Sequence, residues 1–230
     1  MREATMNPSG TVSMKVIKAK KEPKEINSNS LKSLLYHSSP FVSGLDWKVR
    51  MWKLKNLPNI MRGLWKISVA KVFNMPIFYG VLSIVITKAD GTQINYGLAS
   101  TRVVTDAGVG FIVDAFQNSV ELETMKYHAL GTGSTAEAAG DTALVTELTT
   151  EYTVNSTRAT GTTAENAANI YESVATNTVD ATVALREHGV LSQAATGGGV
   201  LLDRTLFSAI NLVSGDSLAS TYRLTLTAGS

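Results

Sequence analysis

Residues 217–227, SLASTYRLTLT, indicate the fold class of this chain because their apolar and polar side chains alternate. Tyr222, Leu224 and Leu226 fall on one side of an extended backbone, and the polar residues between them fall on the other. This period of two is typical of an antiparallel strand with one buried face. A Ser-Gly-Asp turn signal joins this run to the apolar run 200–212, so the end of the chain predicts two neighbouring strands.

Similar runs recur through the chain from residue 72 onward. The Asp-Gly pair at 90–91 is a turn candidate between VLSIVITKA (81–89) and TQINYGLAS (92–100), which predicts a hairpin. The other strand-like runs are 125–130, 152–158, 169–177, 181–190, 200–212 and 217–227. At least seven strands with glycine-rich turns and few helices predict a mainly β fold, either an antiparallel β-sandwich or a small barrel.

One or two short helices are expected among these strands. Asp106 is a good N-cap for the first, which should end near residue 118. The apolar stripe of this helix consists of Val109, Ile112, Val113 and Phe116. Asp141 is a candidate cap for a second helix, which would run through Leu148.

The charge of the chain is divided unevenly along its length. Residues 1–71 contain 14 Lys and Arg and 4 acidic residues, which leaves 7 basic (21 − 14) and 15 acidic (19 − 4) residues in 72–230. We therefore expect a basic, partly disordered N-terminal arm, residues 1–71, followed by a β-rich assembly domain, residues 72–230. An arm with this charge favours an acidic partner, either protein or nucleic acid, and we expect protein.

The arm supplies the candidate binding residues. They are Lys15, Lys18, Lys20, Lys21, Lys24, Trp47 and Trp52. Residues 1–30 have too few apolar side chains to offset the entropy of ordering, so we expect them to be disordered when free. The stretch WKVRMWKLKNL (47–57) puts four apolar residues, Trp47, Met51, Leu54 and Leu57, near one helical stripe. A short amphipathic helix here could lie on a membrane, a nucleic acid or a partner subunit, or its aromatic residues could dock on the chain's own domain.

The side chains that carry chemistry show no pattern typical of an enzyme. The chain has no cysteine, and His37, His128 and His188 are not spaced as metal ligands. Glu187 and His188 could form an acid–base pair, but adjacent strand residues face opposite sides. The glycine-rich loop 131–141 lacks the lysine of a P-loop. Three further carboxylates fit capping and solvation on polar faces: Asp141, Glu147 and Glu151. We expect no catalysis, no cofactor and no metal.

Membrane insertion is also not expected. The uncharged run 72–87 is shorter than the roughly 20 apolar residues of a spanning helix and contains Pro76 and Gly80. A buried strand over 81–87 explains the run better, because this part is rich in β-branched residues.

Four stretches carry a resemblance to structural proteins of tailed bacteriophages. They are VTDAGVGFIVDAFQN, MKYHALGTGSTAEAAGDTALVTELTT, ATVALREHGVL and LLDRTLFSAINLVSGDSLASTYRLTLTAGS, within 103–230. The pattern is similar to head decoration (cement) proteins or to tail and fibre components, and it brings no active-site residue with it. It implies a virion protein, assembled in the host cytoplasm, that binds copies of itself, for example as a trimer, and other virion proteins such as the major capsid protein. The leading expectation is a capsid decoration protein, and the alternative is a tail or fibre component whose N-terminal region docks on the tail.

Overall fold

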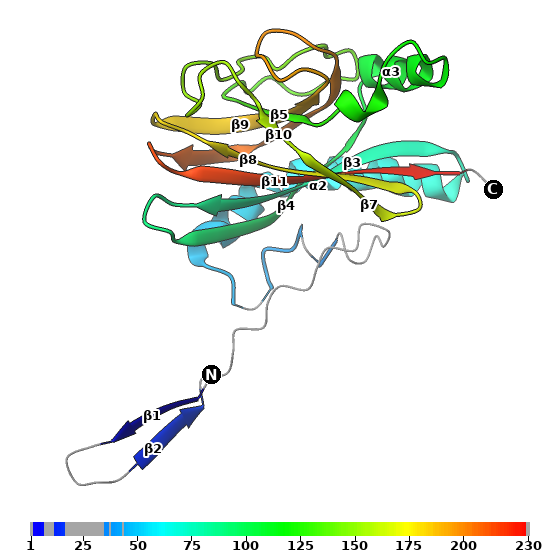
Figure 1. Cartoon of the computed structure of the whole chain (residues 1–230). Helices are drawn as coiled ribbons and strands as arrows, with labels where there is room; N and C mark the ends of the chain where they lie inside the picture. Colours follow the sequence, from blue (N-terminus) through cyan, green and yellow to red (C-terminus); the bar gives the residue numbers. More distant parts are fainter. Residues whose placement is uncertain (1, 7–11, 17–34, 37, 43, 229–230) are drawn as a thin grey trace.

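The structure is a computed structural model that describes residues 2–6, 12–16, 35–36, 38–42 and 44–228. It is mainly β, with two antiparallel sheets that lie one above the other as in a β-sandwich (Figure 1). The five-stranded sheet has the order β4 (Gln93–Val103), β3 (Ile77–Thr87), β11 (Ser217–Thr227), β8 (Ile170–Thr178), β7 (Thr162–Ala167). The four-stranded sheet has the order β10 (Leu201–Leu212), β9 (Val183–Leu191), β5 (Tyr127–Gly131), β6 (Ala159–Thr160). The predicted fold class is therefore confirmed.

The core lies between the two sheets because each contributes one apolar face. Leu82, Ile84 and Ile86 alternate along β3 and meet residues of β9 and β10 such as Leu185 and Phe207. At the other end of the sandwich, side chains of β11 join a second cluster with residues of β9 and β10. Burial of these faces is the main favourable contribution to folding.

Strand β11 confirms the alternation seen in the sequence. Tyr222 and Leu224 are buried in the cluster between the sheets, and Leu226 packs against it. The strand pairs with β3 on one side and β8 on the other, without a shift in either register. Its central place explains why its pattern is so regular, since both edges are hydrogen-bonded and one face is buried.

The predicted hairpin is formed by β3 and β4. Gly91 has φ +83°, in the left-handed region that the turn requires, and Asp90 accepts a hydrogen bond from the backbone N–H of Thr92.

Helix α2 (Trp47–Val72) is much longer than the short helix expected from 47–57 and continues through Pro58. It covers the outer face of the β3–β4 half of the five-stranded sheet (Figure 1), where Ile60, Leu64 and Ile67 pack on Tyr79, Val81 and Leu98. These six residues form a third apolar cluster.

Polar side chains of α2 also bind both sheets. Asn56 donates from Nδ2 to the carbonyl oxygen of Ala99 in β4 and accepts from the N–H of Ser208 in β10, 3.0 Å away. The indole N–H of Trp52 donates to the carbonyl oxygen of Ser208, 2.6 Å away. Ser208 lies where the β9–β10 register shifts, so α2 satisfies backbone groups that the neighbouring strand leaves unpaired. Residues 47–71, placed in the N-terminal arm by the sequence, thus share a core with 72–230.

Helix α3 (Asp106–Phe116) lies near its predicted place, with two differences. The cap is Thr105, whose hydroxyl accepts from the N–H of Gly108, and Asp106 is the first helical residue. The predicted stripe does not form one buried face. Phe111 and Ile112 are buried against β10, whereas the three other predicted positions, Val109, Val113 and Phe116, are exposed.

Two predictions for residues 141–158 are wrong. No helix runs from Asp141 to Leu148, because the backbone N–H groups of Val145 and Thr146 donate to the Glu187 carboxylate instead of to helical carbonyls. The run 152–158 is not a strand either. It makes only isolated bridges, Tyr152 with Val179 and Thr157 with Ala195, because it belongs to the loops that cover the four-stranded sheet. A short 3-10 helix, η1 (Leu122–Thr124), leads into β5.

Part of the N-terminal segment that we expected to be disordered has secondary structure. Residues Arg2–Met6 (β1) and Val12–Val16 (β2) pair as an antiparallel hairpin. No helix in the described part of the chain has the length and apolar character needed to cross a membrane.

Candidate docking surfaces on helices α2 and α3

Two histidines lie in contact between the sheets, where neither ring reaches solvent. Nδ1 of His128 is 3.0 Å from Nε2 of His188 and 2.7 Å from the hydroxyl of Ser220. On the other side of the His128 ring, Nε2 is 2.9 Å from the hydroxyl of Ser173. Burial lowers the pKa of His128 to about 3, and burial together with the neighbouring ring lowers the pKa of His188 well below its usual value. Both rings are neutral near pH 7, and the cluster joins β5, β8, β9 and β11.

The neighbouring Glu187 leaves the opposite face of β9 and holds a loop in place. Its carboxylate accepts from the backbone N–H groups of Gly133, Val145 and Thr146, at 2.8 to 3.1 Å. Arg204 on β10 donates to the same carboxylate from Nε, 2.8 Å away. Glu187 and His188 therefore do not face one site, as their spacing in the sequence indicated. The chemical role of Glu187 is to neutralise a buried cation and bind the loop 131–146.

Arginine side chains extend this pattern of internal pairing. Arg204 also donates to Asp141, 2.9 Å away, and these carboxylates raise its pKa although burial alone would lower it. The buried Arg158 donates from two nitrogens to both oxygens of Glu147. The capping and solvation expected for Asp141 and Glu147 describe them only in part: Asp141 accepts from the backbone N–H of Ala138, but both carboxylates are partly buried and each is paired with a buried guanidinium. Of the three, Glu151 lies as expected, in a turn where it accepts from the N–H of Thr149.

These clusters limit what the interior can do chemically. Among the described residues, no group of three or more His, Asp or Glu side chains could hold a metal ion. A hollow of about 290 Å³ lies beside Arg158 and Glu147, but its walls include a glycine turn, 197–199, and the guanidinium is engaged with Glu147 and two backbone carbonyls. The buried arginines and the carboxylates beside them therefore neutralise each other's charge.

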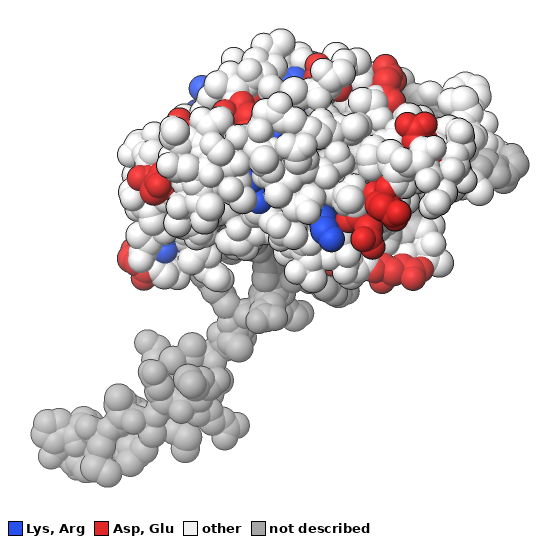
Figure 2. Space-filling model, turned by 45° about the horizontal axis from the view of Figure 1, so that its top comes forward, with Lys and Arg blue, Asp and Glu red and all other residues white. Residues whose placement is uncertain are grey.

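The outer side of α3 is apolar and acidic. Val109, Val113 and Phe116 are exposed at a spacing of four and three residues, which places them on one stripe, and Phe116 is 84% exposed. The exposed acidic residues of this surface are Asp106, Asp114, Glu121 and Glu123, and the segment 106–124 contains no Lys or Arg. In Figure 2, Asp and Glu atoms gather along the side of the molecule on which α3 lies in Figure 1. We call 106–124 the acidic surface.

The outer side of α2 is apolar and basic. Its exposed apolar residues follow one stripe at spacings of three, four and seven residues: Trp47, Leu54, Pro58, Met61, Trp65 and Val72. The exposed basic residues beside the stripe are Lys48, Arg50, Lys55, Arg62, Lys66 and Lys71. The helix contains no Asp or Glu. We call this outer side of α2 the basic surface.

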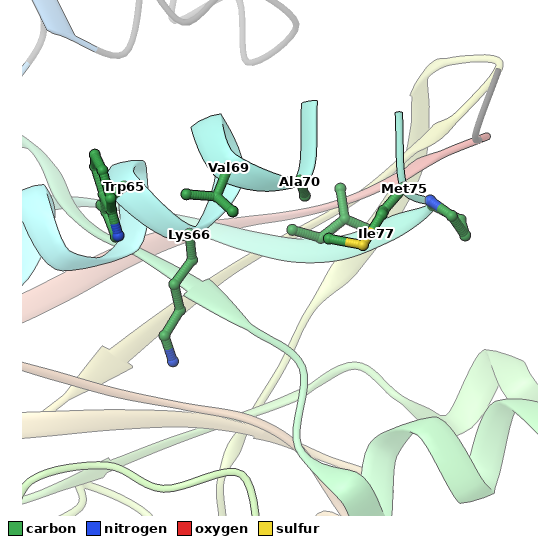
Figure 3. Close-up of a pocket in the computed structure, with 7 residues that line it drawn as sticks. Trp65, Lys66, Val69, Ala70, Met75 and Ile77 are labelled. Atoms are coloured by element: carbon green, nitrogen blue, oxygen red, sulfur yellow. The ribbon is translucent and has the colours of Figure 1, made fainter. Parts of the chain in front are cut away.

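An apolar hollow lies at the C-terminal end of the basic surface (Figure 3). It has a volume of about 320 Å³ and is bounded by α2 and by the start of β3. The lining residues are Trp65, Lys66, Val69, Ala70, Met75, Pro76 and Ile77. Trp65 is 71% exposed at one end, and Met75 is exposed at the other. Exposed apolar side chains gathered around a hollow are typical of a surface that another protein covers.

The candidate residues from the sequence are divided among different environments. Trp47 is 67% exposed on the basic surface, whereas Trp52 is 6% exposed in the core and hydrogen-bonded to Ser208. Lys15 belongs to β2, and Lys18, Lys20, Lys21 and Lys24 lie outside the described residues, as does His37.

Sequence reasoning missed most of the two surfaces. For α2 the usable signal was a second apolar stripe, Val49, Trp52, Ile60 and Ile67, which runs opposite the exposed one and is buried. Two apolar stripes on one helix indicate two contacts, of which the fold provides only one.

Comparison with known proteins adds no identification. No family model, no curated protein and no solved structure matches this chain.

Proposed function

We propose that the chain is a non-enzymatic structural protein of a phage particle, and specifically a capsid decoration protein that binds the head and stabilises it through protein–protein contacts. The observation that carries the proposal is the pair of exposed apolar helix surfaces on a body whose buried ionisable groups bind one another. A protein that works by assembly needs apolar area left uncovered in the free subunit. The phage-type pattern within 103–230 supports the same function.

The basic N-terminal segment supplies the contact with the head in this proposal. Residues 1–34 hold seven basic and three acidic residues, a net charge of +4. A segment of this kind can bind the acidic surfaces of neighbouring capsid subunits and order on contact. The major capsid protein is therefore the partner that we propose, ahead of nucleic acid.

Imaging of intact particles tests this function. Particles made without the protein would be incubated with the full-length wild type or with a variant in which five lysines of the segment, Lys15, Lys18, Lys20, Lys21 and Lys24, are changed to Gln. We expect wild-type density on heads, greater resistance of those heads to heat, and reduced occupancy with the variant. Density on tails alone would reject decoration, and absence from all particles would reject a virion role. Equal occupancy by the variant would reject the lysine contact.

A further inference from the structure

We infer that the basic surface on α2 of one copy binds the acidic surface on α3 of another copy of the same chain. This inference rests on the proposal that the chain works by assembly, and it specifies the contact between copies. Each surface has what the other requires: exposed apolar side chains along a helical stripe, flanked by charges of a single sign. Opposite charges around an apolar centre select the partner and fix the orientation.

For the basic surface of α2, charge disfavours the other partners that the chain itself could supply. The N-terminal segment has a net charge of +4, so it would be repelled from the basic surface of α2. Two basic surfaces would repel each other in a symmetric α2–α2 contact, as would two acidic surfaces in an α3–α3 contact. The segment 106–124 is an exposed part of the chain with four acidic residues, no basic ones and an apolar stripe.

The hollow on the basic surface could receive an apolar side chain of the acidic surface. α3 is about 16 Å long and α2 about 39 Å, at 1.5 Å per residue, so α3 covers only part of the basic surface. The hollow beside Trp65 and Met75 has room for an apolar side chain. Phe116, at the end of α3, is the most exposed of the large apolar residues in the described part of the chain. In the inferred contact, Phe116 of one copy fills this hollow in the next.

The position of the acidic groups supports this orientation. Asp114 and Glu121 lie close to Phe116 in the sequence on the exposed side of α3 and the turn after it. On the other surface, Lys66 lines the hollow, and Arg62 is one helical turn before it. The two surfaces are different parts of the molecule, so the contact is heterologous. Such contacts build rings when the rotation closes and chains when it does not.

A charge-reversal experiment on the full-length protein tests the contact. The first variant carries Arg62→Glu and Lys66→Glu on α2, and the second carries Asp114→Lys and Glu121→Lys on α3. Sedimentation velocity at about 50 mM salt, where surface charges are only weakly screened, would measure association. We expect the wild type to associate and each variant alone to bind itself at least about tenfold more weakly, because like charges then face each other.

Mixing the two variants separates this contact from every other explanation. In the mixture both possible α2–α3 pairs are again oppositely charged, so association should return to within about threefold of the wild type. A single chain with all four changes should also recover. A nucleic acid, an anionic membrane or a capsid protein as the partner of α2 would give no such recovery. A wild type that stays monomeric, or a mixture that does not associate, overturns the inference.

The apolar part of the contact has its own matched pair of variants. Phe116→Ser should weaken association by about tenfold or more, as expected for the loss of an aromatic anchor in a hollow. Phe41→Ser is the control, because Phe41 is 77% exposed but belongs to neither surface. Equal effects of the two changes would overturn the role of Phe116. None of these measurements uses phage particles, so they test the contact between copies independently of head binding. Either proposal can therefore fail without deciding the other.

Discussion

At the scale of single residues, Glu187 is the side chain on which most local structure depends. It is fully buried, pairs with a guanidinium and accepts three backbone N–H groups from a loop that has no regular secondary structure. The carboxylate thereby replaces the hydrogen bonds that a helix or strand would have supplied to that loop.

Removing this carboxylate should destabilise the protein strongly. We expect Glu187→Ala to lower the free energy of unfolding by about 3–5 kcal/mol, because the buried Arg204 loses a partner and three N–H groups lose their acceptor. Glu187→Gln keeps one acceptor oxygen and should cost less. Glu165→Gln, an exposed position on β7, is the control and should change stability by under about 0.5 kcal/mol. Urea unfolding measures all three, and a loss below about 1 kcal/mol for Glu187→Ala would contradict this role.

At the scale of elements, the close approach of α2 to β4 depends on Gly63. A Cβ atom added there would overlap the carbonyl oxygen of Thr101, whose hydroxyl donates to the carbonyl oxygen of Ile60 one turn earlier. The helix can therefore lie directly on the backbone of the strand. This contact aligns Asn56 and Trp52 with the partners that join α2 to both sheets.

Two glycine-to-alanine changes in helices should have opposite effects for this reason. Gly63→Ala should lower the free energy of unfolding by about 1–3 kcal/mol, since the overlap outweighs the better helix propensity of alanine. Gly110→Ala in α3 should raise it by up to about 1 kcal/mol, because nothing lies within 4 Å of the added methyl group. Thermal unfolding of dilute protein would compare the two. A stabilising Gly63→Ala would mean that α2 does not lie as close to β4 as described.

At the scale of the whole molecule, the buried histidines link the stability of the sandwich to pH. The unfolded chain takes up protons on His128 and His188 near pH 6.5, whereas the folded protein does not until well below that value. The unfolded state therefore binds more protons in this window, and stability rises with pH. The contribution is fully present above about pH 6.5 and is lost as the pH falls towards 3.

The free energy of unfolding between pH 7 and pH 5 measures this effect. We expect a loss approaching about 1.4 kcal/mol per pH unit for each histidine below pH 6.5. A His128→Asn, His188→Leu double variant should show a flatter profile, even if it is less stable at pH 7. Carboxylates titrate mainly below this window and are shared by both proteins, so they cancel in the comparison. Parallel profiles would contradict the neutral, buried state of the two rings.

The charge distribution of the whole molecule separates its two surfaces. The basic residues of α2 lie on the outer face of the five-stranded sheet, and the acidic residues of α3 lie beside β10 of the other sheet. The excess of basic residues before residue 71 and of acidic residues after it thus corresponds to two separate surfaces of the folded protein. Two copies joined through the inferred contact would still expose one surface of each kind, α3 on one copy and α2 on the other.

The sheet class of this protein can be read from local sequence patterns alone. Strands β3, β8, β9, β10 and β11 and the turn at Asp90-Gly91 follow from residues close together in the chain, because alternation and turn chemistry are local properties. The opposite charges of 1–71 and 72–230 are likewise a property of composition. These features could be predicted because no distant contact is needed to produce them.

Which apolar stripes belong to the core depends on contacts between distant segments, and these are visible only in the folded protein. On α2 and α3, apolar residues occur on more than one side, so Trp52 and Trp47, or Ile112 and Val113, cannot be told apart by spacing. The partners of Glu187 could not be predicted either, since they come from residues 133–146 and 204. The sequence around a carboxylate in a strand does not indicate which distant groups it will bind. Burial and pairing depend on segments brought together from far apart in the chain, which is why the two docking surfaces emerged only with the fold.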